Sequence, residues 1–172
     1  MAIFGSSRDV SFIRKINREY LGDIVNQQCV FYKYDLAQNK SNIYGEPENG
    51  NRIFKAPVIF NCLINRGDQE FTSDELGIDF KRDLDFYLLR DDLVDANLFP
   101  EIGDIIMYHE GYFEIYNLVD NQLFTGKNPD YPNEPNPLNT GLSKFGYSVS
   151  IICKTHYIAV DKANIIKSRL NG

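Results

Sequence analysis

The chain of 172 residues has few of the side chains that most often carry chemistry. It contains no tryptophan, two histidines and three cysteines. His109 and His156 have no other His or Cys at the spacing of a zinc site, so we expect no bound metal. Cys29, Cys62 and Cys153 each stand alone in an apolar stretch, without a Cys-x-x-Cys pair. This pattern predicts three reduced, buried thiols.

The sequence also lacks the motifs of several enzyme classes. It has no Gly-x-Ser-x-Gly elbow, no Gly-x-x-x-x-Gly-Lys-Ser/Thr loop and no Gly-x-Gly-x-x-Gly after a strand. Asp91-Asp92 and Asp83-x-Asp85 are candidate carboxylate pairs for a hydrolase or a calcium site. Acid–base catalysis requires surroundings that shift the pKa of a carboxyl group, and alternation places Asp83 and Asp85 on a solvated strand face. We therefore expect no catalytic residue, no cofactor and no enzymatic activity.

Long apolar runs and basic clusters are missing as well. No stretch approaches the ~20 apolar residues of a membrane span, and the N-terminus has no long apolar run that would predict secretion. The formal net charge is −6, whereas a protein that grips DNA phosphates would carry a basic face. The acidity is concentrated in residues 68–101, where eleven acids and three bases give −8. Such a span is either an ordinary solvated face or a wall that keeps DNA mobile by repulsion.

What the sequence does contain predicts a helix followed by a β domain. Residues 11–27 have apolar side chains at three- and four-residue spacing, which predicts a helix. These side chains are Phe12, Ile13, Ile16, Tyr20, Leu21 and Ile24. Such a stripe packs either on its own domain or on a neighbouring subunit. The 11 Tyr and 12 Phe residues favour strands in the rest of the chain.

Five segments predict the strands of this β domain. They are residues 29–36, 53–64, 83–89, 103–119 and 147–160. Pro57 indicates that the second segment is an edge strand or starts near Pro57, the third shows clear alternation, and the fourth is a hairpin that turns at Glu110-Gly111. Residues 37–51, 67–80 and 126–146 are predicted to be three long loops.

The organisation that follows is one domain over residues 1–172. It has an N-terminal helix at about 9–27, a β domain at about 28–160, and a tail or short helix at about 161–172. The fold class is mostly β, a small antiparallel barrel or sandwich of five to seven strands, because small β domains remove their exposed edges by closing. An SH3-like barrel is one such fold.

A series of short motifs carries a resemblance to a known family. The motifs are Leu76-Gly-Ile-Asp-Phe, Asp83-Leu-Asp-Phe-Tyr-Leu-Leu, Asp91-Asp92-Leu, Pro100-Glu-Ile-Gly-Asp-Ile-Ile-Met-Tyr108, Tyr112-Phe-Glu-Ile-Tyr-Asn-Leu-Val119 and Gln122-Leu-Phe-Thr-Gly-Lys-Asn-Pro129, with Ile43-Tyr-Gly-Glu46 before them. They extend over residues 43–146, more than half of the chain, and they resemble the neck proteins of contractile-tailed bacteriophages. The chain departs from the family in size, since many neck proteins are longer.

The resemblance implies a structural role in the virion. It implies a β-barrel core and a ring of six copies in the head–tail connector, synthesised in the host cytoplasm. The ring would join the portal or head-completion ring to the tail, and DNA would pass nearby without specific binding. The resemblance implies no membrane, no small-molecule substrate and no enzymatic activity. The alternative is a tail-terminator, tail-tube or baseplate component, which would share the small barrel and the long loops.

Two predicted loops offer candidate contacts with other subunits. Residues 126–146 contain four of the seven prolines, and proline lowers the entropy that a segment loses on ordering. Aromatic side chains are frequent anchors of interfaces. The candidate interface residues are Tyr44, Tyr131, Pro132, Pro135 and Phe145.

A third candidate group would line a channel for DNA. Each phosphate that Lys or Arg neutralises adds affinity for DNA, so a wall built for passage should lack these residues. The acids of the predicted loop at 67–80 suit such a wall, although they could also serve only to keep a surface loop solvated. The candidate channel residues are Asp68, Glu70, Asp74 and Glu75.

Overall fold

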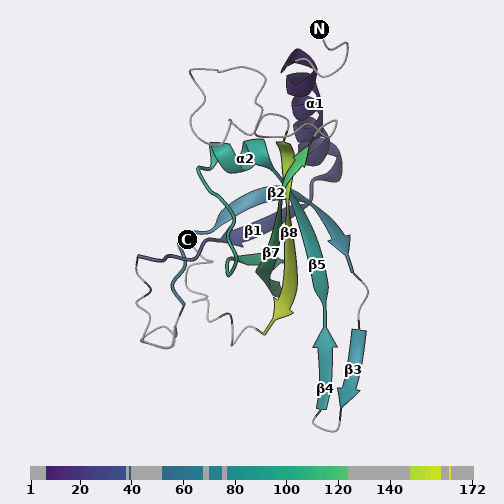
Figure 1. Cartoon of the computed structure of the whole chain (residues 1–172), viewed down its shortest axis with the longest axis vertical. Coiled ribbons are helices and arrows are strands. Elements are labelled where there is room, and N and C mark those ends of the chain that lie inside the picture. Colours follow the sequence, from purple (N-terminus) through teal and green to yellow (C-terminus); the bar gives the residue numbers. More distant parts are fainter. Residues whose placement is uncertain are drawn as a thin grey trace.

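The chain forms a closed antiparallel barrel of six strands. The computed structural model describes residues 7–37, 39, 52–67, 70–74, 77–123, 148–159 and 163. The barrel strands are β1 (Gln28–Tyr32), β2 (Val58–Arg66), β5 (Asp83–Leu89), β6 (Ile105–Tyr108), β7 (Gly111–Leu123) and β8 (Ser148–Ile158). Their order around the barrel is β1-β2-β5-β8-β7-β6, with β6 returning to β1. Figure 1 labels β1, β2, β5, β7 and β8 among them. Closure leaves none of these strands with an exposed edge, and the predicted small β-barrel with an N-terminal helix is confirmed.

Alternation along the strands directs many of the core side chains into the barrel, most clearly in β5. In β5, Leu84, Phe86 and Leu88 are buried in the barrel interior as predicted, and the residues between them are not. The ring of Phe86 lies 6.0 Å from that of Tyr108 and 5.9 Å from that of Phe113, measured between centroids. Aromatic pairs at this separation stabilise a core beyond the area that they bury.

The three cysteines are free and buried in this core, as the sequence predicts. Hydrogen bonding to the Cys62 thiol, together with burial, raises the pKa of Cys29. Burial likewise raises the pKa of Cys153. A thiol with a raised pKa stays protonated and unreactive at neutral pH, so these residues act as small apolar core side chains.

The predicted hairpin at 103–119 is confirmed as β6 and β7, but its turn is one residue earlier than predicted. Tyr108 pairs with Gly111, so the connection is His109-Glu110 and not Glu110-Gly111. The positive φ that the turn requires is at His109, with φ 51°. Gly111 instead permits close packing, because a Cβ there would lie 3.0 Å from the ring of Phe113.

The predicted loop at 67–80 is wrong. It contains β3 (Glu70–Asp74) and β4 (Gly77–Lys81), which pair with each other in a separate two-stranded sheet. Phe71 is opposite Phe80 in the register. Figure 1 shows this hairpin projecting from the end of the barrel opposite to the helices. The strand predicted over residues 53–64 begins at Val58, directly after Pro57.

Two helical segments lie at the other end of the barrel (Figure 1). The N-terminal helix consists of α1 (Ser7–Glu19) and a π-helical segment, η1 (Tyr20–Val25), which ends at Asn26 with φ 43°. A short helix, α2 (Arg90–Asp95), follows β5. In the described part of the chain, no helix is long and apolar enough to cross a membrane. Of the predicted tail, Ala163 alone is described, and it is helical and buried.

Candidate functional site

Most of the candidate residues predicted from the sequence lie outside the described residues. They are Tyr44, Tyr131, Pro132, Pro135 and Phe145 among the interface residues, and Asp68 and Glu75 among the channel residues. Glu70 and Asp74 are the two ends of β3, opposite Lys81 and Gly77 in its register with β4. The structure thus places two of the four acids on one projecting hairpin, and their role at a channel stays a prediction.

The two histidines occupy different positions in the barrel. His109 is in the β6–β7 turn, and His156 is in β8, where its ring is 5.9 Å from that of Tyr116. Within the described ranges, no group of three His, Cys, Asp or Glu side chains is arranged to hold a metal ion.

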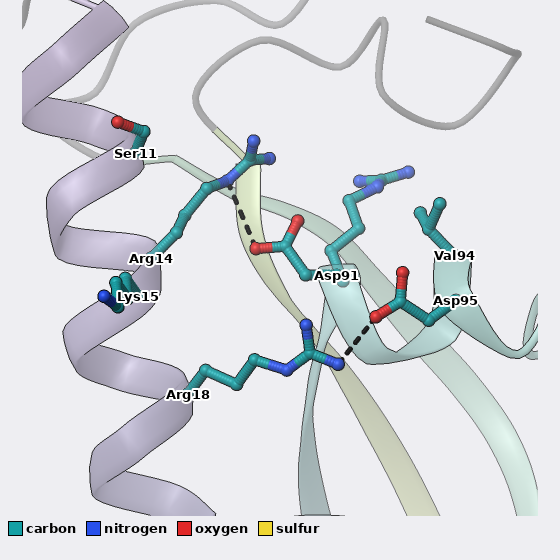
Figure 2. Close-up of a pocket in the computed structure, with 8 residues that line it drawn as sticks. Ser11, Arg14, Lys15, Arg18, Asp91, Val94 and Asp95 are labelled. Carbon is teal, nitrogen blue, oxygen red and sulfur yellow. Dashed lines mark hydrogen bonds and ion pairs between the residues drawn. The ribbon is translucent and has the colours of Figure 1, made fainter.

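The helices α1 and α2 are joined by charged side chains. Arg18 contacts two acids of α2, with Nε 2.8 Å from Asp92 Oδ1 and Nη2 2.6 Å from Asp95 Oδ2. One turn earlier, Arg14 Nε lies 3.7 Å from Asp91 Oδ2. Figure 2 shows both arginines reaching from α1 towards α2. We call these five residues the charged seam.

The two acids that contact Arg18 lie in different environments. Arg18 and Asp95 are both largely exposed, and the hydrogen bond to Asp95 raises the pKa of Arg18. Asp92 is more enclosed, and burial raises its pKa although the charge of Arg18 acts in the opposite direction. Exposed ion pairs contribute little to stability, so α1 is held here by contacts that water and salt can weaken.

Arg90, the first residue of α2, lies beneath the charged seam. It is 1% exposed, and its Nη1 donates a hydrogen bond of 2.9 Å to Ser148 Oγ. Arg14 Nη2 donates to the carbonyl oxygen of the same Ser148, also at 2.9 Å. A cavity of about 410 Å³ lies between α1 and α2, with Arg14, Arg18 and Arg90 in its wall. Asp91 and Asp95 also line it, which gives a polar joint between the helices and the first residue of β8.

The opposite face of the N-terminal helix carries an apolar stripe. Its members are exposed large side chains at four-residue spacing: Phe12 at 64%, Ile16 at 44%, Tyr20 at 51% and Ile24 at 71%. In an α-helix, every fourth residue drifts around the axis because a turn holds 3.6 residues. The wider turn of η1 reverses this drift and keeps Ile24 in line. We call these four residues the outer stripe.

The expectation that the apolar side chains of the N-terminal helix pack on their own domain holds for only some of them. Packing on its own domain applies to Leu21, which is buried, and in part to Ile13. The outer stripe does not pack on the barrel, since the face that contacts α2 is the one with Arg14 and Arg18. One signal in the sequence is consistent with this orientation, because Arg14 and Arg18 have the same four-residue spacing as Asp91 and Asp95.

A second apolar surface crosses the outside of the barrel. Leu63 of β2 is paired with Tyr87 of β5, Tyr87 with Ile152 of β8, and Ile152 with Val119 of β7. The residues next to them, Cys62, Leu88, Cys153 and Leu118, belong to or pack against the core. Alternation therefore directs all four paired side chains outward. Leu63 is 45% exposed and the other three are partly exposed. We call these four residues the outer row.

The motif at 100–108 builds a buried polar network. Asp104 is fully buried, and its carboxylate accepts hydrogen bonds from the backbone N–H groups of Tyr34 (2.9 Å) and Glu101 (2.7 Å). Lys33 Nζ lies 3.0 Å from Asp104 Oδ2 and 2.8 Å from Glu101 Oε2. Gly103, with φ 92°, provides the turn that aims Asp104 inward. The motif thus ties the segment after β1 to the start of β6.

Compared with known proteins, the chain matches no family model and no curated protein. The fold and the surfaces define it as a small closed β-barrel with an N-terminal helix that turns its apolar side away from the barrel.

The charged seam leads to a prediction about salt. Replacing Arg18 with Ala should lower the free energy of unfolding by about 1 kcal/mol or less, but should increase hydrogen exchange in α1. In the wild type, raising salt from 0.15 M to 1 M should have a similar effect, because the screening length falls from about 8 Å to about 3 Å.

Lys15 provides the matched control for this prediction. It is exposed on the same helix, and in the described structure it pairs with Glu19 at 3.9 Å and with no residue of α2. Lys15→Ala should therefore leave the exchange rates of α1 unchanged. Equal effects of the two substitutions would show that the charged seam does not hold the helix.

Proposed function

We propose that the protein is a non-catalytic structural protein of a tailed-phage virion, located in the neck. There it forms a ring of six copies that joins the portal or head-completion ring to the tail, and it helps retain and pass DNA. The outer stripe is the observation that carries this proposal. A protein that acts alone gains nothing from four large apolar side chains in water, whereas such patches mark sites of association with other proteins.

The barrel supports the same proposal. Among the motifs that resemble neck proteins, several fall on described elements in or beside the barrel, namely β5, α2, β6 and β7, and one falls on β4 of the projecting hairpin. The buried Asp104 network lies between α2 and β6 along the chain. The closed barrel has no edge strand through which copies could add, although the β3–β4 hairpin outside it is not closed. Such a subunit would associate through side-chain surfaces such as the outer stripe.

The experiment that tests this function is a nonsense mutation in the gene, in the phage that carries it. Lysates of the mutant should contain DNA-filled heads and complete tails that have not joined, and the heads should lose DNA on storage. Addition of the purified protein should restore joined, infectious particles. Normal particles from the mutant would refute a structural role in the virion.

The same lysates distinguish the runner-up function. A tail-terminator, tail-tube or baseplate component would leave stable, closed heads and would instead give tails of abnormal length or no tails. That outcome would move the protein from the neck to the tail.

A further inference from the structure

The outer stripe and the outer row are two unlike apolar surfaces on one chain. The outer stripe is a ridge on a helix, and the outer row is a line of side chains across the strands of a sheet. We propose that the outer stripe of one copy packs on the outer row of the next copy, head to tail. This inference rests on the proposed function only where the repeated contact closes into a ring. The contact between two copies needs no other protein, so it can be tested with the purified chain.

The lengths of the two surfaces agree. Phe12 and Ile24 are twelve residues apart, which corresponds to about 18 Å at 1.5 Å per residue. The outer row crosses four strands, so its ends are about 14 Å apart at roughly 4.8 Å per strand. A helix lying across the strands would thus place its side chains over the whole row.

The area also fits an interface between copies. Phe and Tyr side chains bury 150–250 Å² each, so the four residues of the outer stripe, about half exposed, present on the order of 400 Å² of apolar surface. A stable interface buries about 800 Å² per partner, with an apolar centre and a polar rim. Polar residues that could form a rim flank both surfaces. They are Lys15, Glu19 and Asp23 beside the outer stripe, and Asp85 and Lys154, which are opposite each other in the register, beside the outer row.

A head-to-tail contact accounts for more of the surface than a two-fold contact. Pairing of two outer stripes would cover both helices and leave both outer rows in water. Packing of the outer stripe on the outer row covers both surfaces with one repeated contact. A repeated head-to-tail contact closes into a ring or continues as a filament, and the proposed ring is the closed form.

The charged seam suits this arrangement. Arg14 and Arg18 hold α1 beside α2 through ion pairs, which permit small changes in the angle of the helix more readily than a packed apolar joint would. The helix can therefore adjust to the neighbouring barrel while it stays attached to its own.

Cysteine cross-linking of the purified full chain tests the contact. Ile16→Cys and Leu63→Cys place one accessible thiol on each surface, and both positions are about half exposed, so the fold should tolerate the changes. Wild-type protein provides the background, because its own three thiols are buried. A short bismaleimide should link a mixture of the two variants into a dimer, whereas neither variant alone should form one.

Three results would overturn the proposal. Self-linking of Ile16→Cys alone would show a two-fold contact between helices, and absence of any link in the mixture would show that the surfaces do not meet. The third is equal linking with a control, Ile102→Cys, which exposes a thiol before β6 and outside both surfaces. If the mixture links as expected but the purified protein fails to restore joined particles, the contact stands and the neck function falls.

Discussion

Replacing Asp104 with Ala should destabilise the barrel by about 3–5 kcal/mol, because breaking a buried ion pair leaves its partners without compensation. Two backbone N–H groups and the ammonium of Lys33 lose the same acceptor. Burial raises the pKa of Asp104, and the two N–H groups and Lys33 oppose that rise, so the carboxylate depends on these partners. Urea unfolding measured at neutral pH checks the prediction.

Two further variants separate the causes of that loss. Glu101→Ala removes the exposed partner of Lys33 and should cost about 1 kcal/mol or less. Asp104→Asn keeps the shape of the side chain but exchanges one acceptor for a donor. Its loss of unfolding free energy should therefore lie between those of Asp104→Ala and Glu101→Ala. If Asp104→Ala were no more costly than Glu101→Ala, the buried network would not be what fixes the start of β6.

The barrel strands could be predicted because each carries a local signal. The alternation in β5 and the Gly-containing turn of the β6–β7 hairpin are properties of a few neighbouring residues. The predicted turn is one residue too late because Gly111 was expected to provide the positive φ. In the structure His109 has the positive φ. The order of the strands around the barrel could not be read from the sequence, since β1 pairs with β6 across more than 70 residues.

The hairpin of β3 and β4 is not predicted because acidic and other polar residues interrupt its two short strands. Five residues on each side are too few for a clear pattern, and Asp and Glu are disfavoured in strands. The structure shows that Phe71 and Phe80 pair across the ribbon. A prediction based on the composition of the segment does not detect this register.

Only part of the outer stripe's arrangement could be predicted from the sequence. The apolar spacing from Phe12 to Ile24 was clear, but which face of the helix would contact the barrel depended on Asp91, Asp92 and Asp95, more than 60 residues away. The excess of acid in residues 68–101 predicts a single span that is either a solvated face or the wall of a channel. In the structure part of it, in α2, is paired with arginines of α1.

The core and the outside of β5 should respond very differently to truncation. Phe86 is fully buried, and its ring contacts those of Tyr108 and Phe113. Phe86→Ala should lower the free energy of unfolding by about 3–5 kcal/mol, because it removes buried apolar surface and leaves a cavity among aromatic rings that collapse poorly. Urea unfolding of the monomer checks the value.

Tyr87 is the matched control, because it is the next residue on the same strand but points outward into the outer row. Tyr87→Ala should cost about 1 kcal/mol or less in the monomer, since a partly exposed side chain leaves no closed cavity. It should instead weaken the head-to-tail contact, seen as less cross-linking between Ile16→Cys and Leu63→Cys copies that both carry it. The pair thus separates two roles on one strand: Phe86 stabilises each barrel, and Tyr87 contributes to association between barrels. A loss of stability for Tyr87→Ala equal to that of Phe86→Ala would mean that the outer row is already packed within the monomer, and it would then be closed to a neighbouring helix.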